Sequence, residues 1–347
     1  MRIVVTGATG NVGTSVLDAL GRDDAVASIL GIARRLPAAT FAKTEFAAAD
    51  VVTGDLVPLL RGADCVIHLA WLIQPSHDEA TLRRTNVDGS QRLFEAVVEA
   101  GVRALVVASS VGAYSPRADS QPVDESWPTE GIPASWYSRQ KAEVERRLDR
   151  LEVDLPDLRV VRMRPAITTK RAAASGQRRL FAGPFLPSAL LRPGWIPFVP
   201  DVPGLTLQLV HADDVGDAYR RAALSDARGA FNLAAEPVLD PAAIAHALET
   251  RTLRLTAGIL RGAARATWLA RAQPTSPDWL DLAFGAPVLD AGRARSELGW
   301  SPTRRADETL REVVAGIREG AGLATPPLQP GRGGALTSVR SGHTSRR

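Results

Sequence analysis

The chain has 347 residues, of which 45% are hydrophobic, and it carries a formal net charge of +4. This length and apolar content suit one large or two interlocked domains with a substantial core. The single cysteine, Cys65, excludes a disulfide framework and a cysteine-based metal site, and the scattered histidines lack metal-binding spacing.

The positive charge is concentrated at the C-terminus. Residues 326–347 are rich in Gly, Pro and Ser and contain four arginines, and without these the basic and acidic residues are equal in number. The body therefore indicates no nucleic-acid partner, and we expect residues 326–347 to be a disordered basic tail. A basic arm that contacts an acidic partner is the alternative. The sequence shows no signal peptide or membrane span, so the cytoplasm is the expected location.

The N-terminal residues predict a dinucleotide-binding turn. Residues 2–6 are an apolar, β-branched run typical of a buried parallel strand. Gly7, Gly10 and Gly13 follow at intervals of three, and an apolar helical pattern then runs to residue 21. Glycines at these positions permit a tight turn, close approach of backbone N–H groups to a pyrophosphate, and close packing of helix on strand. The position between a strand and a helix distinguishes this segment from an ordinary glycine-rich turn.

Strand and helix patterns alternate along the chain, which predicts a parallel sheet with helices on both faces. Further strands are predicted at residues 27–33, 44–49, 65–70, 104–109, 158–164, 207–210 and 230–234, and helices at 79–100, 135–151, 213–223 and 306–320. The alternation stops in residues 172–204, which are rich in Pro, Gly and aromatic residues.

We therefore predict an α/β fold, a Rossmann-type doubly wound parallel sheet with a small, mostly helical C-terminal substrate-binding cap. The dinucleotide-binding domain is assigned to residues 1–170 and 205–240, and the cap to residues 171–204 and 241–325. Ligands bind at the carboxyl ends of the strands in such sheets, beneath this cap.

Tyr137 and Lys141 carry the most specific chemical signal. Positions four apart share one face of a helix, so the phenol and the ammonium point into the same space. A free tyrosine has a pKa near ~10, too high for a base at neutral pH. A nearby ammonium, together with an oxidised nicotinamide ring, favours the phenolate and brings it into the range for proton transfer. Ser110 follows the predicted strand at 104–109, where a hydroxyl can bind a substrate oxygen beside the tyrosine.

Together these motifs resemble the extended short-chain dehydrogenase/reductases of the NAD-dependent epimerase/dehydratase family. The matching segments cover nearly the whole chain: residues 6–13 (TGATGNVG), 50–51 (DV), 68–70 (HLA), 86–89 (NVDG), 109–114 (SSVGAY), 137–141 (YSRQK), 164–165 (RP), 211–215 (HADDV) and 298–302 (LGWSP). The resemblance implies that Tyr137 is the catalytic acid/base, that Ser110 binds the carbonyl, and that Lys141 holds the nicotinamide ribose. It also implies a small-molecule substrate and a homodimer formed through helices that include 79–100 and 135–151.

The resemblance further implies where NAD(P) binds. Asp50 and Val51 would flank the adenine, and Leu69, Ala70 and the Pro165 backbone would lie along the nicotinamide half. The full set of predicted cofactor-binding residues is Gly7, Thr9, Gly10, Asn11, Val12, Gly13, Arg34, Arg35, Asp50, Val51, Leu69, Ala70, Trp71, Asn86, Ser109, Tyr137, Lys141, Pro165 and Ile167.

One departure from the usual pattern concerns the cofactor. An NAD-preferring site usually ends its second strand with an acid that binds the ribose 2′-OH. This chain has Arg34 and Arg35 there and no carboxylate, which suits a 2′-phosphate and favours NADP over NAD. The alternative is that both arginines are ordinary loop charges.

Two further departures concern the substrate. Similar members that act on nucleotide sugars carry an Arg-Asp pair whose arginine clamps the substrate phosphate, but this chain has Leu207 and Gln208 there. A UDP-sugar substrate is therefore in doubt. Dehydratases carry an Asp-Glu pair beside the catalytic hydroxyl, where this chain has Val111 and Gly112, which argues against sugar dehydration.

Apolar and aromatic residues gather in the segments predicted to surround the substrate. We predict substrate contacts from Leu72, Ser110, Trp136, Trp195 and Phe198. Packing within the cap is an equally good explanation for the apolar members of this set. His68 lies in a predicted strand and His211 before a predicted helix, and both are interpreted as structural residues rather than as metal ligands.

The sequence thus predicts hydride transfer between NADP and a small carbonyl or alcohol substrate, without a metal ion. An epimerase that retains NAD shares the same triad and is the main alternative. A catalytically silent NAD(P)-binding sensor or scaffold is the alternative of a different class.

Overall fold

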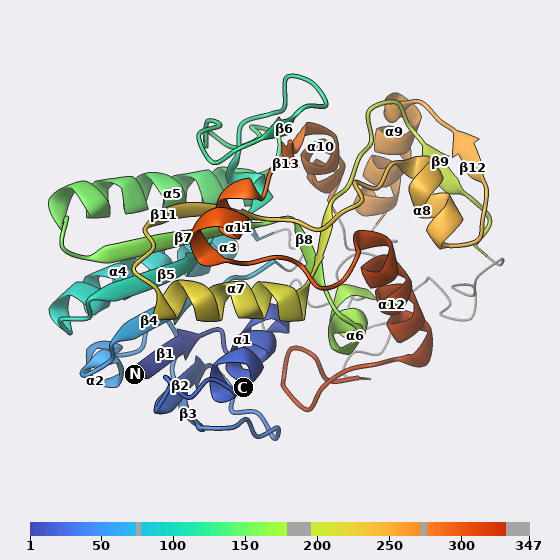
Figure 1. Cartoon of the computed structure of the whole chain (residues 1–347). Coiled ribbons are helices and arrows are strands. Elements are labelled where there is room, and N and C mark those ends of the chain that lie inside the picture. The colour runs from blue at the N-terminus through green and yellow to red at the C-terminus, as the bar shows by residue number, and fades with distance from the viewer. Residues whose placement is uncertain (74–77, 179–195, 271–275, 331–347) are drawn as a thin grey trace.

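A parallel sheet of seven strands forms the centre of the molecule. The computed structural model describes residues 1–73, 78–178, 196–270 and 276–330 (Figure 1). The strands lie in the order β11-β7-β5-β4-β1-β2-β3, which confirms the predicted doubly wound sheet. They are β1 (Arg2–Thr6), β2 (Ser28–Ala33), β3 (Thr44–Ala48), β4 (Cys65–His68), β5 (Ala104–Ala108), β7 (Arg159–Pro165) and β11 (Gly229–Leu233).

The central strands are buried on both faces, which explains why they read as continuous apolar runs rather than as alternating ones. Ile3 and Val5 of β1 contribute to the core on one face of the sheet, and Val4 contributes to the core on the other. Ile3 pairs with both Ile29 of β2 and Cys65 of β4. Because all of these pairings are parallel, the carboxyl ends of the strands meet at one edge of the sheet.

Helices cover both faces of the sheet. On one face lie α1 (Asn11–Gly21), α7 (Ala212–Leu224) and α11 (Gly292–Leu298), and on the other lie α2 (Val57–Leu60), α4 (Gly89–Glu99) and α5 (Trp136–Asp154). The α1–α7 contact is close, since a Cβ atom at Gly216 would lie 2.6 Å from the carbonyl oxygen of Ser15. Both helix layers therefore fix the ends of the strands from which the site is built.

The C-terminal elements gather beyond the carboxyl ends of the strands, as Figure 1 shows. They include the helices α6 (Ala174–Gln177), α8 (Pro241–Ala247), α9 (Ala257–Leu269), α10 (Asp278–Gly285) and α12 (Ala306–Glu319). Short parallel pairs join them to the rest: β10 (Leu209–His211) with β8 (Ile167–Thr169), β12 (Thr252–Arg254) with β9 (Val199–Asp201), and β13 (Val288–Leu289) with β6 (Pro122–Val123). Among the described residues, no helix combines the length and apolar character needed to cross a membrane.

The structure differs from the sequence predictions in two places. The helix predicted at 79–100 consists of α3 (Glu79–Arg83), the π-helical turn η1 (Arg84–Asp88) and α4. Residues 326–330, predicted to belong to a disordered tail, are folded, because Leu328 is buried and its N–H donates to the carbonyl oxygen of Thr325 at 3.0 Å. The rest of that predicted tail, residues 331–347, lies outside the described part of the chain.

Candidate functional site

The turn between β1 and α1 has no space for side chains at two of its glycines. Gly7 has a φ angle of +68°, and a Cβ atom there would lie 2.6 Å from the carbonyl carbon of Leu69. A Cβ atom at Gly13 would lie 2.4 Å from the carbonyl oxygen of Gly7. The first turn of α1 therefore packs directly on the turn that follows β1. This is the cradle that a dinucleotide pyrophosphate requires.

Asn11 fixes this turn to a neighbouring strand. Its Nδ2 donates to the carbonyl oxygen of Thr168 in β8 at 2.9 Å. Its Oδ1 is buried and has no hydrogen-bond partner within the described residues, although buried polar atoms normally have one. A hydroxyl group of a bound nucleotide could supply the missing donor. The glycine cradle and this acceptor together make the turn fit a dinucleotide.

The residues predicted for the adenosine end lie after β2 and β3. Arg34 and Arg35 directly follow β2, and both are exposed. Where the chain is described, neither arginine forms an ion pair, so both charges are accessible to a phosphate. After β3, the Oδ1 of Asp50 accepts the N–H of Val52 at 2.8 Å, while Val51 is buried against α4.

The residues predicted for the nicotinamide half lie at adjacent strand ends. Leu69 and Ala70 follow β4, Ser109 follows β5 and Pro165 ends β7, and these three strands are neighbours in the sheet. Ile167 begins β8 and is 47% exposed. The fold thus brings segments that are far apart in the sequence together at the carboxyl ends of the central strands.

Tyr137 and Ser110 meet at the start of α5. Ser110 precedes the 3₁₀ turn η2 (Val111–Ala113), and its hydroxyl, which accepts the N–H of Gly112 at 3.0 Å, lies near enough to the Tyr137 phenol to lower the pKa of that phenol. The phenol ring lies so close to this turn that a Cβ atom at Gly112 would be 2.7 Å from its Cε1. The hydroxyl of Ser138 donates to the carbonyl oxygen of Gly112 and ties the same turn to α5. The predicted acid/base and the predicted carbonyl-binding hydroxyl are therefore together.

Lys141 lies one helical turn beyond Tyr137. Its Nζ donates to the carbonyl oxygen of Ala108 at 2.6 Å and lies 3.5 Å from the ring centroid of Trp71. Burial lowers the pKa of Lys141 to about 7 and raises the pKa of Tyr137 to about 12. We expected the ammonium, together with an oxidised nicotinamide ring, to lower the pKa of Tyr137. In this structure burial dominates instead, because indole rings surround the phenol and keep water away from both groups.

Glu145 lies one turn beyond Lys141, and the sequence analysis missed it. Its buried carboxylate accepts hydrogen bonds from Ser109 Oγ, from Arg164 Nε at 2.9 Å and from Arg162 Nη1 at 3.0 Å. Burial opposes its ionisation, but Arg164, Arg162 and Ser109 hold its pKa at about 2. The carboxylate also raises the pKa of Lys141, against the effect of burial. Its spacing of four residues after Lys141 was the available sequence signal.

The role of Glu145 in this network can be tested by measuring the stability of a variant. We expect Glu145→Gln to lower the free energy of unfolding by about 3–5 kcal/mol, because two buried guanidinium groups lose their shared carboxylate. Asp149→Asn is the matched control, since Asp149 pairs with the same Arg162 but its side chain is 57% exposed. The control should cost about 1 kcal/mol or less. Urea unfolding of both variants measures the difference, and equal losses would contradict the role given to Glu145.

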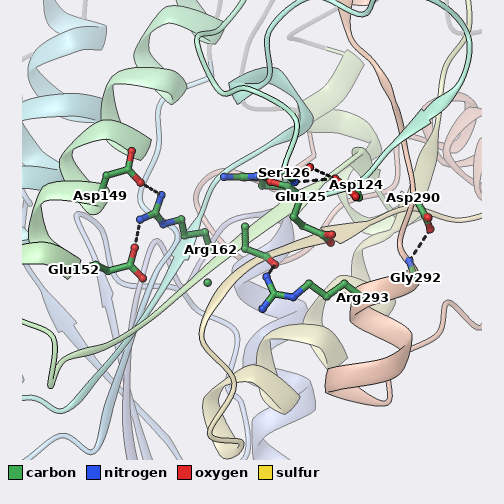
Figure 2. A pocket seen from close by; sticks show the side chains of 12 residues that line it. Asp124, Glu125, Ser126, Asp149, Glu152, Arg162, Asp290, Gly292 and Arg293 are labelled. Carbon is green, nitrogen blue, oxygen red and sulfur yellow. Dashed lines mark hydrogen bonds and ion pairs between the residues drawn. The ribbon is translucent and has the colours of Figure 1, made fainter.

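Arg162 extends the network to a cavity on the far side of α5. Figure 2 shows its guanidinium between Asp149 and Glu152, with an ion pair to each. The cavity has a volume of about 770 Å³ and is lined by Asp124, Glu125, Ser126, Asp149, Glu152, Arg162, Arg164, Gly229, Ala230, Asp290, Gly292 and Arg293. It lies beside β7 and β11, and Tyr137 does not line it, so it is separate from the catalytic groups.

Three indole rings surround Tyr137. Its ring centroid lies 6.1 Å from that of Trp71, 6.0 Å from that of Trp136 and 5.2 Å from that of Trp279. Leu282, on the same helix as Trp279, packs in this cluster. Trp279 and Leu282 belong to α10, so the C-terminal part of the chain covers the phenol. The sequence analysis missed both residues, although Trp279 and Leu282 are three positions apart, the spacing of one helical face.

Asn86 holds the segment that carries Trp71. It lies in the π-helical turn η1, and its Oδ1 accepts the N–H of Leu72 at 2.7 Å. Its Nδ2 donates to the carbonyl oxygen of Leu72 and to Gln140 Oε1, both at 2.9 Å. Asn86 therefore fastens the chain after β4 to α5. Interruptions of this kind in a helix often lie at functional sites.

The remaining predicted residues are placed as follows. Trp195 lies outside the described residues. Phe198 directly precedes β9, in the β9–β12 pair, and is not among the residues that form the cluster around Tyr137. The hydroxyl of Ser109 donates to the carboxylate of Glu145, so only the backbone of Ser109 is available to a bound nucleotide.

His68 is a structural residue, as predicted. Its Nδ1 lies 2.7 Å from Thr6 Oγ1 and its Nε2 lies 2.9 Å from Ser90 Oγ. Burial lowers its pKa to about 3, so the ring is neutral. In the described ranges, His, Cys, Asp and Glu side chains form no group that could hold a metal ion.

The whole chain is similar to several known proteins. Residues 3–168 match the model of the NAD dependent epimerase/dehydratase family. The chain is 32% identical over 337 residues to UDP-glucose 4-epimerase of Mycolicibacterium smegmatis, covering 92% of this chain and 99% of that protein. Among solved structures, it resembles gox2253 with a TM-score of 0.71 at 25% identity, covering 92% of this chain and 98% of the other. It also resembles UDP-glucose-4-epimerase from Stenotrophomonas maltophila with bound NAD and formylated UDP-arabinopyranose, with a TM-score of 0.68 at 20% identity and the same coverage.

Proposed function

This chain belongs to the NAD dependent epimerase/dehydratase family, and we propose that it transfers a hydride between NADP, or NAD, and a carbonyl or alcohol group of an apolar substrate. The residues that would hold the nucleotide are those of the turn after β1, with Arg34 and Arg35 at its adenosine end and Lys141 at its nicotinamide end. A bound nicotinamide nucleotide supplies or accepts the hydride.

Tyr137, Ser110 and Lys141 have separate roles in the proposed reaction. Tyr137 gives a proton to the carbonyl oxygen in reduction, or removes one from the hydroxyl in oxidation, and Ser110 orients that oxygen. Protonated Lys141 has two N–H donors beyond its bond to Ala108, and these would hold the nicotinamide ribose. When protonated, Lys141 also stabilises the Tyr137 phenolate and opposes the effect of burial on its pKa.

The indole cluster around Tyr137 is the observation that favours an apolar substrate. Trp71, Trp136 and Trp279 present mainly apolar surface to the catalytic phenol. The indole N–H groups of Trp71 and Trp136 are buried without a partner in the described residues, so each can bind a substrate oxygen. Gln208, at the position where nucleotide-sugar enzymes were expected to carry a phosphate clamp, bonds both the N–H and the carbonyl oxygen of Leu289.

Three measurements test this proposal. We expect the protein to oxidise NADPH in the presence of medium-chain or aromatic aldehydes and ketones, and to leave UDP-galactose unchanged. Denatured protein should release little nucleotide, because a reductase exchanges its cofactor at each turnover. Stoichiometric release of NAD⁺, together with conversion of UDP-galactose to UDP-glucose, would overturn the proposal.

An epimerase that retains NAD is the second candidate, and the 32% identity to a UDP-glucose 4-epimerase over nearly the full length supports it. Such an enzyme would use the same triad to oxidise and re-reduce one sugar carbon.

A silent nucleotide-binding sensor, in contrast, would keep its biological activity when Tyr137 loses its hydroxyl. The homodimer and the cytoplasmic location stay predictions from the sequence.

The arginines after β2 give a prediction for nucleotide choice. We expect the double variant Arg34→Ala with Arg35→Ala to weaken NADPH binding by about 10-fold to 100-fold, because a 2′-phosphate loses charge-assisted hydrogen bonds. NADH binding should change by less than about twofold, since NADH lacks that phosphate. Arg103→Ala, whose side chain is 85% exposed, is the control for a general loss of positive charge. Titration of nucleotide fluorescence measures all three proteins, and equal weakening for both nucleotides would show that the arginines do not select NADP.

A further inference from the structure

The chain turns back after α12 and forms a short folded segment, residues 321–330, which we call the C-terminal strap. Gly320 ends α12 with a φ angle of +66°. The N–H of Leu323 donates to the carbonyl oxygen of Leu328 at 3.1 Å, and Thr325 and Leu328 are both buried. Figure 1 shows this segment, in red-orange, running from the end of α12 toward α1. The strap is therefore part of the folded body.

The strap contacts two loops that belong to the predicted nucleotide site. The hydroxyl of Thr325 donates to the carbonyl oxygen of Thr9, in the glycine-rich turn, at 2.9 Å. The carbonyl oxygen of Ala324 accepts the N–H groups of Ala38 and Ala39 at 3.1 and 3.0 Å. Ala38 and Ala39 lie in the loop that begins with Arg34 after β2. Two consecutive strap residues thus join the glycine-rich turn to the arginine-bearing loop.

The adenosine ribose of a dinucleotide lies between these two loops in a doubly wound sheet. A segment that ties the loops together forms a third side of that space. The strap residues have no charged side chain, so the strap can position the arginine-bearing loop but offers a phosphate no cationic group. The three hydrogen bonds of Ala324 and Thr325 oppose any separation of the two loops, and so oppose release of a nucleotide held between them.

We propose that the C-terminal strap slows release of the nucleotide, through the hydrogen bonds of Ala324 and Thr325 to the two loops that enclose its adenosine ribose. This inference rests on the proposed use of NAD(P). It assigns to Thr325 a positioning role, since Thr325 acts on the nucleotide through Thr9. Slower release is compatible with exchange of the nucleotide at each turnover, because three hydrogen bonds lower the release rate without making binding permanent.

Nucleotide dissociation rates test the proposal in the full-length protein and in two truncations. Stopped-flow displacement of bound NADPH and NADH by excess NADP⁺ gives the rates directly. A chain that ends at Leu323 should release both nucleotides at least about 10-fold faster, because all three hydrogen bonds are lost. A chain that ends at Pro330 keeps the strap and should release them within about twofold of the full-length rate. Unchanged or slower release from the shorter chain would overturn the proposal, and slower release would identify the strap as an inhibitor.

Point variants keep the test decisive if the shorter chain does not fold. Thr325→Val keeps the shape of the side chain but removes its donor, and it should speed release about threefold to tenfold. Thr325→Ser keeps the hydroxyl and should restore the slow rate, which a purely structural role for the methyl group would not do. Wild-type release rates from Thr325→Val would also overturn the proposal. If the wild-type protein binds neither NADPH nor NADH, the proposed function itself fails, and this outcome is distinct from the others.

Discussion

Tyr137→Phe should reduce turnover by about 100-fold to 10,000-fold and leave nucleotide affinity within about twofold. The substitution removes only the hydroxyl, so the ring keeps its contacts with Trp71, Trp136 and Trp279. The loss falls on proton transfer because the substitution removes only the hydroxyl that would carry the proton. Turnover is measured as NADPH oxidation with the aldehyde and ketone panel, or as UDP-galactose conversion if that reaction is found.

Tyr114→Phe is the matched control for this prediction. The Tyr114 hydroxyl donates to Asn232 Oδ1 at 2.6 Å and accepts from Arg164 Nη1 at 3.0 Å, and it is fully buried. Its removal should lower the free energy of unfolding by about 1–3 kcal/mol while turnover stays near the wild-type value. The two variants should thus separate stability from chemistry. Wild-type turnover in Tyr137→Phe would exclude Tyr137 as the acid/base.

Gly13→Ala should weaken NADPH and NADH binding by at least about 100-fold and lower the melting temperature. The added methyl group would lie 2.4 Å from the carbonyl oxygen of Gly7 and 2.7 Å from the backbone of Ala8. Backbone atoms cannot move aside as a flexible side chain can. The first turn of α1 must therefore shift away from the turn that holds the pyrophosphate, and both nucleotides share that group.

Alanine substitutions at two other glycines are compared with Gly13→Ala, and the three are expected to differ in their effect on affinity. A Cβ atom at Gly10 would lie 3.3 Å from the carbonyl oxygen of Gly7, so Gly10→Ala should weaken binding less. Gly262, on α9, has no atom within 4 Å of its Cβ position, and alanine there should stabilise the helix by about 0.5–1 kcal/mol without changing affinity. Nucleotide titration and thermal unfolding of all three variants check the order. An affinity for Gly13→Ala equal to that of Gly262→Ala would contradict the placement of the nucleotide.

Much of the fold follows from local patterns in the sequence. The apolar run at residues 2–6, the glycines that follow it and the amphipathic stretch to residue 21 each specify their own conformation, so β1, its turn and α1 were predicted within about one residue. The same reasoning placed Tyr137 and Lys141 on one face of α5, because helical spacing alone brings positions four apart together. The alternation of these units is enough to predict a parallel sheet covered on both faces.

Other features depend on contacts between distant parts of the chain. Trp279 packs on Tyr137 across more than a hundred residues, and Thr325 bonds Thr9 across 316 positions. Hydrophobic periodicity is read over a short window of residues, so it cannot reveal either of these contacts. The π-helical turn at residues 84–88 was hidden for the same reason, since it is stabilised by the bonds of Asn86 to Leu72 and Gln140.

The sequence by itself thus determined the parallel sheet, the nucleotide turn and the pairing of Tyr137 with Lys141, because each is encoded by residues close together in the chain. Only the tertiary structure decided the pKa values of Tyr137 and Lys141. The sequence showed an ammonium beside a phenol, but the burial that lowers the pKa of Lys141 to about 7 and raises that of Tyr137 to about 12 comes from everything packed around them. Desolvation is a property of the whole surroundings, so it is fixed only when the distant segments have come together.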